Sequence, residues 1–179
     1  MTQAEKRAKE IFAQQIGELQ KVSDRIGAEM NQVVEMIYAC RGKLVIMGVG
    51  KTGIIGHKIA SSLASTGTPS IFVNAAEAMH GDLGMISPND IALLISNSGS
   101  SMEIINVVGP LKKIGCRIIA MTGNPQSPLA HEAEIILNVG VEKEACPLGL
   151  APTTSTTATL VMGDALTICL MERRNFKAE

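Results

Sequence analysis

The sequence has 179 residues, of which 46% are hydrophobic, and its formal net charge is −1 at pH 7. A chain of this size can bury one sizeable hydrophobic core but hardly two, so we expect a single continuous domain over residues 1–179. Its near-neutral charge and 2% aromatic content argue against a nucleic-acid surface, which needs clustered cations and stacking rings.

Cysteine and histidine positions argue against a metal site or a disulfide framework. The cysteines, Cys40, Cys116, Cys146 and Cys169, form no CxxC pair, and the three histidines are equally scattered. The first residues, MTQAEKRAKE, lack the apolar core of a signal peptide. No uninterrupted apolar run approaches the roughly 18 residues that span a bilayer. The sequence therefore predicts a cytoplasmic protein with reduced thiols, no bound metal and no membrane partner.

Apolar residues recur every three or four positions through the first forty residues. This stripe comprises Phe12, Ile16, Leu19, Val22, Ile26, Met30, Val33 and Ile37. The period predicts one long helix over about residues 3–40. Such a stripe is longer than a small domain usually needs to cover, so we expect part of it to pack on another subunit. Burial within the chain is the alternative.

After residue 42 the pattern changes to short, β-rich apolar runs. Strands are predicted at residues 43–49, 69–73, 90–96, 117–122 and 134–139, and helices near 53–65, 102–114, 127–132 and 153–172. Alternation of strand and helix implies parallel pairing. Continuously apolar strands fit a sheet that is covered on both faces, and ligands of such sheets bind beyond the carboxyl ends of the strands.

The turn after the first predicted strand reads GVGKTG over residues 48–53. A dinucleotide site is disfavoured because the second strand ends at Asn74 rather than at an acidic residue. A nucleotide P-loop fails on spacing, since Val45 stands where a glycine is needed. There remains a glycine turn at a helix amino end, with Lys51 and Thr52, that suits an anion. A plain tight turn with a solvated lysine is the alternative.

The third predicted strand runs directly into SNSGSS, residues 96–101, before a helix that carries Glu103. Helix capping explains one serine, not four. Hydroxyl groups at the end of a strand, beside a helix start whose dipole contributes about 0.3–1 kcal/mol toward an anion, predict a phosphate cradle. We expect the hydroxyl and amide groups of this loop to form it, with nearby Lys51 as an additional donor.

Two further loops place titratable side chains at the same predicted edge. His80, in the segment EAMHGD, is a candidate acid or base because imidazole titrates near neutral pH, although local hydrogen bonding is an alternative. Glu144 lies in EKEACPLGLAP, which precedes the hydroxyl run TTSTT. It is the candidate base, because partial desolvation would raise its pKa toward the working pH. The hydroxyl run caps the last helix or touches the ligand.

The ordered motifs GVGKTG, NAAEAMHGDLGM, SNSGSSMEI and EKEACPLGLAPTTSTTATLVMGDAL resemble the sugar isomerase (SIS) domain, and within it the arabinose 5-phosphate isomerases, over about residues 40–172. The resemblance implies a three-layer α/β fold with a five-stranded parallel, flavodoxin-like sheet and a homotetrameric assembly. The implied reaction interconverts D-ribulose 5-phosphate and D-arabinose 5-phosphate through an enediol, without a cofactor. That aldose feeds 3-deoxy-D-manno-octulosonate synthesis for lipopolysaccharide or capsule in Gram-negative bacteria.

Position by position, the resemblance implies catalytic roles for Lys51, His80, Glu103 and Glu144. It implies sugar-phosphate binding for Thr52, Ser96, Ser98 and Ser101. Glu144 would act as the base, and His80 would assist ring opening or oxygen protonation. Lys51 and Glu103 would stabilise and orient the enediolate.

The sequence departs from the family pattern in three places. Relatives continue past the last helix into an HPGG-like turn, whose histidine joins the active site from a neighbouring subunit, and many carry a tandem cystathionine-β-synthase-type pair. This sequence stops at Glu179 and has Ser100 where relatives often have glutamate, so a stand-alone catalytic domain is expected. The alternatives are a sedoheptulose or hexulose phosphate isomerase, a non-catalytic sugar-phosphate regulator and an oligomeric scaffold. A non-catalytic regulator would not need the titratable residues Lys51, His80, Glu103 and Glu144, so their presence favours an enzyme.

Overall fold

A computed structural model describes residues 1–177 and contains one five-stranded sheet in the order β2-β1-β3-β4-β5. The strands are β1 (Leu44–Gly48), β2 (Ser70–Asn74), β3 (Ile91–Ile95), β4 (Arg117–Thr122) and β5 (Ile135–Asn138). Every neighbouring pair is parallel. The predicted parallel α/β sheet is therefore confirmed, and only β2 extends beyond its predicted run, by one residue.

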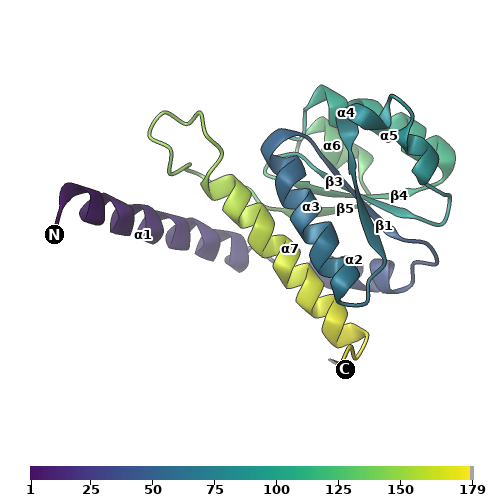
Figure 1. Ribbon diagram of the computed structural model, residues 1–179, viewed down its shortest axis with the longest axis horizontal. Helices are drawn as coiled ribbons and strands as arrows, with labels where there is room; N and C mark the ends of the chain where they lie inside the picture. Colours follow the sequence, from purple (N-terminus) through teal and green to yellow (C-terminus); the bar gives the residue numbers. More distant parts are fainter. Residues whose placement is uncertain (178–179) are drawn as a thin grey trace.

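Helices cover both faces of the sheet, which gives the predicted three-layer, flavodoxin-like architecture (Figure 1). One layer contains α2 (Ala28–Tyr38), α3 (Gly50–Ser65) and α7 (Thr154–Arg173), and the other contains α4 (Ala75–Ala78), α5 (Met102–Ile114) and α6 (Pro128–Glu132). Side chains of a strand alternate between the two layers. In β1, Leu44 and Ile46 pack under the first layer, and Val45 and Met47 pack under the second. A short 3₁₀ helix, η1 (Asp82–Met85), follows α4.

The amino-terminal segment forms two helices, so the prediction of one helix over residues 3–40 is wrong. Helix α1 (Gln3–Asp24) ends before Gly27, whose φ of −128° and ψ of −148° are not helical. The Gly27 N–H donates to the Glu29 carboxylate at 2.7 Å, which caps the start of α2. Glycine lowers the stability of a helix interior by about 1 kcal/mol relative to alanine. The apolar stripe continues across the break, which is why periodicity alone did not reveal it.

The two halves of the apolar stripe have different environments. Val33 and Ile37 of α2 are buried in the core, whereas Phe12 and Ile16 of α1 are 72% and 64% exposed. The first half of α1 projects away from the sheet, as does the loop between β5 and α7 (Figure 1). Burial within the chain therefore accounts for Val22, Val33 and Ile37 and for the partly buried Leu19 and Met30, but not for Phe12, Ile16 or the 40% exposed Ile26.

Helix α7 lies in the core layer, packed on α3. A Cβ added at Gly163 would lie 2.4 Å from the side chain of Ile59, so glycine permits the close approach of the two helices. Thr159 and Thr167 are buried and donate their hydroxyls to backbone carbonyls one turn earlier. Within residues 1–177, α7 alone is long and apolar enough to cross a membrane by those two criteria, and half of it is buried inside the protein.

A buried carboxylate at the amino edge of the sheet has a pH-dependent role in stability. The side chain of Asp90 is 1% exposed and accepts from the Lys43 backbone N–H at 2.9 Å, the Lys43 Nζ at 2.7 Å and the Ser87 N–H at 2.8 Å. Burial raises the pKa of Asp90, but the hydrogen bonds from Lys43 and Ser87 outweigh it, and the net pKa is lowered. The ionised form of Asp90 therefore stabilises the folded state.

We expect Asp90→Asn to lower the free energy of unfolding by about 1–3 kcal/mol at pH 7. Because the folded pKa lies below the unfolded value of about 3.9, the contribution is complete above that value and is lost as the pH falls through the folded pKa. The difference between wild type and variant should shrink as acid is added. Urea unfolding at several acidic pH values measures this difference in the free energy of unfolding. A difference that stays constant with pH would contradict the stabilising role of ionised Asp90.

Candidate functional site

The strand order places a topological switch point between β1 and β3. Strand β1 pairs with β2 on one side and with β3 on the other. Helix α3 leads from β1 to β2, while α5 leads from β3 away to β4. In open α/β sheets, ligands bind in a crevice at such a point, beyond the carboxyl ends of the strands, which here are β1 and β3.

The turn after β1 opens directly into α3, three residues earlier than predicted. Gly50 has a φ of +54°, which glycine adopts readily. No side chain caps this helix, whose N-cap is Val49. Thr52 and the exposed Lys51 therefore lie in the first turn, and the Thr52 hydroxyl donates to the Val49 carbonyl at 2.8 Å. Within residues 1–177, the backbone N–H groups of this turn have no side-chain acceptor, as an anion site requires.

Lys51 lies at the amino end of α3, which is an electrostatically unfavourable position for a lysine that binds no ligand. The amino end of a helix carries a partial positive charge that favours anions and disfavours cations. Within residues 1–177, Lys51 forms no ion pair that would offset this repulsion. Its placement is favourable when an anion occupies the crevice.

The serine-rich loop after β3 contains one buried and several accessible hydroxyls. Ser96 is buried, and its Oγ lies 2.9 Å from the Ser101 Oγ and accepts from the Gly99 N–H at 3.1 Å. Ser98 is exposed and accepts from the Ser100 N–H at 3.2 Å. Ser101 is the N-cap of α5, yet its side chain makes no capping hydrogen bond. A second helix start therefore presents uncapped N–H groups at the same crevice.

Neighbouring loops hold the serine loop in place. The Gly123 N–H donates to the Asn97 carbonyl at 2.9 Å, and the Leu129 N–H donates to the Gly99 carbonyl at 3.0 Å. Gly99 has a φ of +65°, and a Cβ there would lie 2.0 Å from the Ser127 Oγ. Because the loop is held in this way, the donors that it presents to an anion need little reorganisation when the anion binds. The sequence did not reveal that Ser127 packs against Gly99 of this loop, because nothing in the local sequence of Ser127 links it to the loop.

His80 and Glu103 are exposed at the same edge of the sheet. The His80 backbone N–H donates to the Glu77 carbonyl at 2.8 Å, and its imidazole makes no hydrogen bond within residues 1–177. Glu103 lies in the first turn of α5, where a carboxylate is stabilised by the helix dipole without any ligand.

A small pocket of about 170 Å³ adjoins the turn after β1. It is lined by Gly50, Gly53, Ile54, His57, Phe72 and Asn74. The His57 ring stacks on Phe72, with 5.6 Å between ring centroids. This stacking agrees with a structural role for His57.

Glu144 is the most densely hydrogen-bonded of the charged residues predicted from the sequence, and its contacts are with the start of α7 and with α1. It accepts from the backbone N–H groups of Thr153, Thr154 and Ser155 at 2.8, 2.7 and 3.3 Å. The Thr153 hydroxyl donates to it at 2.8 Å, and the Ser155 hydroxyl also donates to it. Glu144 thus binds the amino terminus of α7 and joins that helix to the segment that leaves β5.

The expected direction of the Glu144 pKa is wrong. Burial raises the pKa of this carboxyl, as the sequence suggested, but hydrogen bonds from Ser155 and Thr153 outweigh burial and lower the net pKa. The donors stabilise the charged form more than desolvation destabilises it. Glu144 is therefore ionised at neutral pH. Of the hydroxyl run that was expected to cap α7 or touch the ligand, the Thr153 and Ser155 hydroxyls donate to this carboxylate, whereas those of Thr156 and Thr157 donate to the Thr153 carbonyl.

The structure brings some of the predicted residues together and leaves others apart. Ser96 and Ser101 are in contact through their hydroxyls. Within residues 1–177, no hydrogen bond or ion pair joins Lys51, His80, Glu103 and Glu144 to one another. Topology nevertheless brings the loops after β1, β2 and β3 to one edge of the sheet.

Comparison with known proteins adds independent information. The SIS domain family matches residues 36–169. The arabinose 5-phosphate isomerase KdsD of Pseudomonas aeruginosa is 55% identical over 155 residues, which cover 87% of this chain and 48% of the relative. KdsD of Escherichia coli K12 is 50% identical over 171 residues, covering 96% and 52%. The chain spans about half the length of these curated relatives.

A solved structure gives a nearly full-length match. The Escherichia coli CFT073 protein c3406, in complex with arabinose 5-phosphate, superposes on this chain with a TM-score of 0.94 and 40% identity, covering 99% of this chain and 95% of that one.

Proposed function

Because this chain belongs to the SIS domain family, we propose that it is an aldose–ketose isomerase that interconverts D-ribulose 5-phosphate and D-arabinose 5-phosphate. One observation carries the proposal: the uncapped amino ends of α3 and α5 flank a fixed serine loop at the β1/β3 switch point. The KdsD relatives and the sugar-phosphate complex of c3406 support this choice of substrate. The aldose would supply 3-deoxy-D-manno-octulosonate synthesis for lipopolysaccharide or capsule.

We assign phosphate binding to the serine loop and the first turn of α3. Ser98 and Ser101 offer hydroxyls, and Thr52 would turn its hydroxyl from the Val49 carbonyl toward the phosphate. Lys51 offers a positive charge beside the free N–H groups of the helix. Ser96 supports the loop through its contacts with Ser101 and Gly99. Together these groups match the charge and the hydrogen-bonding capacity of a phosphate dianion.

The proposed reaction moves one carbon-bound proton between C2 and C1. We assign Glu144 as the base that removes the proton from one carbon and returns it to the other, by way of an enediol. His80 would exchange the oxygen protons and assist ring opening, while Lys51 and Glu103 would orient the enediolate. The hydrogen bonds that lower the pKa of Glu144 keep it deprotonated at neutral pH, as a base requires, and they also make it a weaker base than a carboxylate without such donors.

We also propose assembly as a homotetramer. The exposed Phe12 and Ile16 of α1 and the exposed Leu148 and Leu150 of the β5–α7 loop are apolar side chains that a second copy would cover. Light scattering should give four times the mass of the 18.9 kDa chain. A monomer at working concentrations would contradict this assembly.

A cytoplasmic location fits the proposed substrate. A sugar phosphate carries charge and does not cross a bilayer unaided. All four cysteines are free thiols, as a reducing compartment favours.

The proposed activity is tested with D-ribulose 5-phosphate in deuterated water, followed by proton NMR. Arabinose 5-phosphate with deuterium at the exchanging carbon is the expected product, because the enediol exchanges its carbon-bound proton with solvent. Thermal stabilisation by the sugar phosphate without any product would indicate a binding protein instead, since ligand at 100 times its Kd adds about 2.7 kcal/mol. Turnover of a hexulose or sedoheptulose phosphate alone would identify a different isomerase.

A further inference from the structure

We propose that Glu18 of α1 is a positioning residue that fixes the loop carrying Glu144. The inference rests on the proposed function, because it concerns the role of Glu144 in that reaction. It assigns α1 a task beyond subunit packing, since this helix would hold part of the active site of its own chain.

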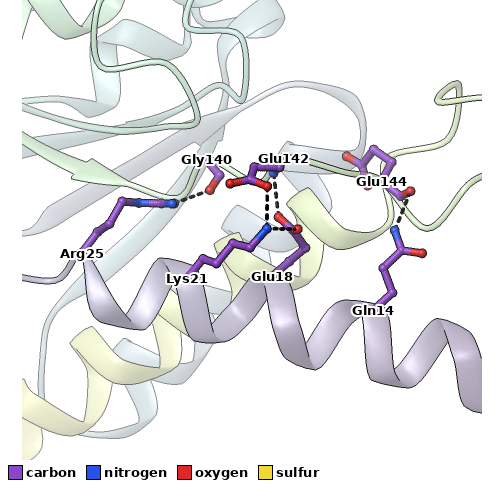
Figure 2. A network of polar contacts seen from close by, with 7 residues as sticks. All are labelled: Gln14, Glu18, Lys21, Arg25, Gly140, Glu142 and Glu144. Atoms are coloured by element: carbon purple, nitrogen blue, oxygen red, sulfur yellow. Dashed lines mark hydrogen bonds and ion pairs between the residues drawn. The ribbon is translucent and has the colours of Figure 1, made fainter.

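Glu18 is a buried carboxylate on a mostly exposed helix. Only Glu18 and Val22 of α1 are buried, and Glu18 is 5% exposed. Its Oε2 accepts from the Glu142 backbone N–H at 2.6 Å, and its Oε1 accepts from Lys21 Nζ at 2.9 Å. Lys21 also pairs with the Glu142 carboxylate at 2.5 Å. Figure 2 shows these contacts converging on the segment that follows β5.

Other side chains of α1 contact the same segment on either side of Glu18. The Gln14 side-chain N–H donates to the Glu144 carbonyl at 3.0 Å, and the Arg25 guanidinium donates to the Gly140 carbonyl (Figure 2). One face of α1 thus contacts residues 140, 142 and 144 in turn. Side chains of a helix three to four residues apart share a face, and alternate residues of the extended segment meet that face.

The contacts of α1 lead without interruption to the Glu144 carboxylate, which is the proposed base. Glu18 holds the Glu142 amide, Gln14 holds the Glu144 carbonyl, and the Glu144 carboxylate binds the first turn of α7. A displacement of the backbone at residue 142 moves the Glu144 carboxylate with it. Misplacement of a catalytic group by about 1 Å costs about 100-fold in rate.

A purely structural reading makes a different prediction. A buried charge is a weak source of stability, and hydrophobic residues often stabilise as well or better. If Glu18 served only to attach α1, its loss would reduce folding or assembly and leave the kcat of the folded enzyme unchanged. Positioning instead predicts a lower kcat with a smaller change in KM, since no hydrogen bond within residues 1–177 joins α1 to the serine loop.

The test compares Glu18→Ala, Glu18→Gln and the control Glu10→Ala in the full chain. Glu10 lies on the same helix but is exposed, and within the described residues 1–177 it pairs only with Arg7. Each variant is assayed for kcat and KM with D-ribulose 5-phosphate and for hydrogen exchange of the amides of α1 and of residues 140–146. We expect Glu18→Ala to lower kcat about 10- to 100-fold and to speed exchange of the Glu142 amide. Glu18→Gln keeps one acceptor oxygen, so it should recover most of the wild-type kcat and most of the protection of the Glu142 amide from exchange. Glu10→Ala should match wild type in both measurements.

Three outcomes would overturn the proposal. Unchanged kcat and exchange in Glu18→Ala would remove the positioning role. Glu18→Gln as slow as Glu18→Ala would assign the effect to the Lys21 ion pair rather than to the amide contact. Faster exchange confined to α1 would reduce Glu18 to an attachment of that helix. If wild type shows no isomerase activity, the proposed function fails, whereas the exchange data still report whether Glu18 holds the loop.

Discussion

Replacing Glu144 by glutamine is expected to slow turnover about 10²- to 10⁴-fold, the usual contribution of general base catalysis. Glutamine keeps one acceptor oxygen but turns an N–H₂ group toward a ring of donors, so the first turn of α7 loses hydrogen bonds. We therefore also expect the free energy of unfolding to fall by about 1–3 kcal/mol. Steady-state kinetics and urea unfolding measure the two effects, and near-wild-type turnover would remove Glu144 as the base.

Ser155→Ala separates catalysis from the capping of α7. It retains the carboxylate and the three backbone donors but removes the Ser155 hydroxyl that lowers the pKa of Glu144. The pKa of Glu144 should therefore rise, and the acidic limb of the kcat profile should move to higher pH. Turnover on the alkaline side of that limb should stay close to wild type. An unshifted limb in an active variant would mean that another group controls it.

Replacing Lys51 by methionine is expected to lower kcat/KM about 10²- to 10³-fold, because a charged donor to the phosphate and the enediolate is lost. Stability should change in the opposite direction. A lysine at the amino end of α3 opposes the helix dipole, so its removal should raise the free energy of unfolding by about 0.3–1 kcal/mol in the absence of ligand. Steady-state kinetics measures the expected fall in kcat/KM, and thermal unfolding of the unliganded protein measures the expected rise in stability.

Lys58→Met provides the matched control on the same helix. Lys58 is also exposed, but it lies two turns further along α3 and pairs with Asp164 of α7. Its loss should leave kcat/KM unchanged and should not stabilise the protein. Equal activity losses in the two variants would point to a general effect of charge on α3 rather than to a contact between Lys51 and the substrate.

The alternation of apolar runs was sufficient to predict the sheet and its helices. Five strands and parallel pairing followed from the period of the hydrophobic residues, and this period reflects which faces are buried. The break at Gly27 was missed because the helical stripe keeps its phase across it. The segment α4 to η1 was missed because four-residue helices are too short to show a period.

The charged residues of the candidate site could be named from the sequence, but their environments could not. Residue type and position after a strand indicated Lys51, His80 and Glu103, since ligands of parallel sheets bind at that edge. The sign of the pKa shift at Glu144 depends on the balance between burial and donors. Those donors come from the start of another helix, nine to eleven residues later.

Residue types and hydrophobic spacing were enough to predict the parallel sheet and the loops that carry candidate residues, because both depend on local sequence and on the period of burial, whereas the family was indicated by the resemblance of the ordered motifs. The folded structure was needed to show that Glu144 is held as an anion at the start of α7 and that Glu18 reaches the Glu142 amide across 124 residues of sequence. Such contacts depend on how separate elements meet in space. No local pattern encodes them, because the partners share neither a period nor a segment.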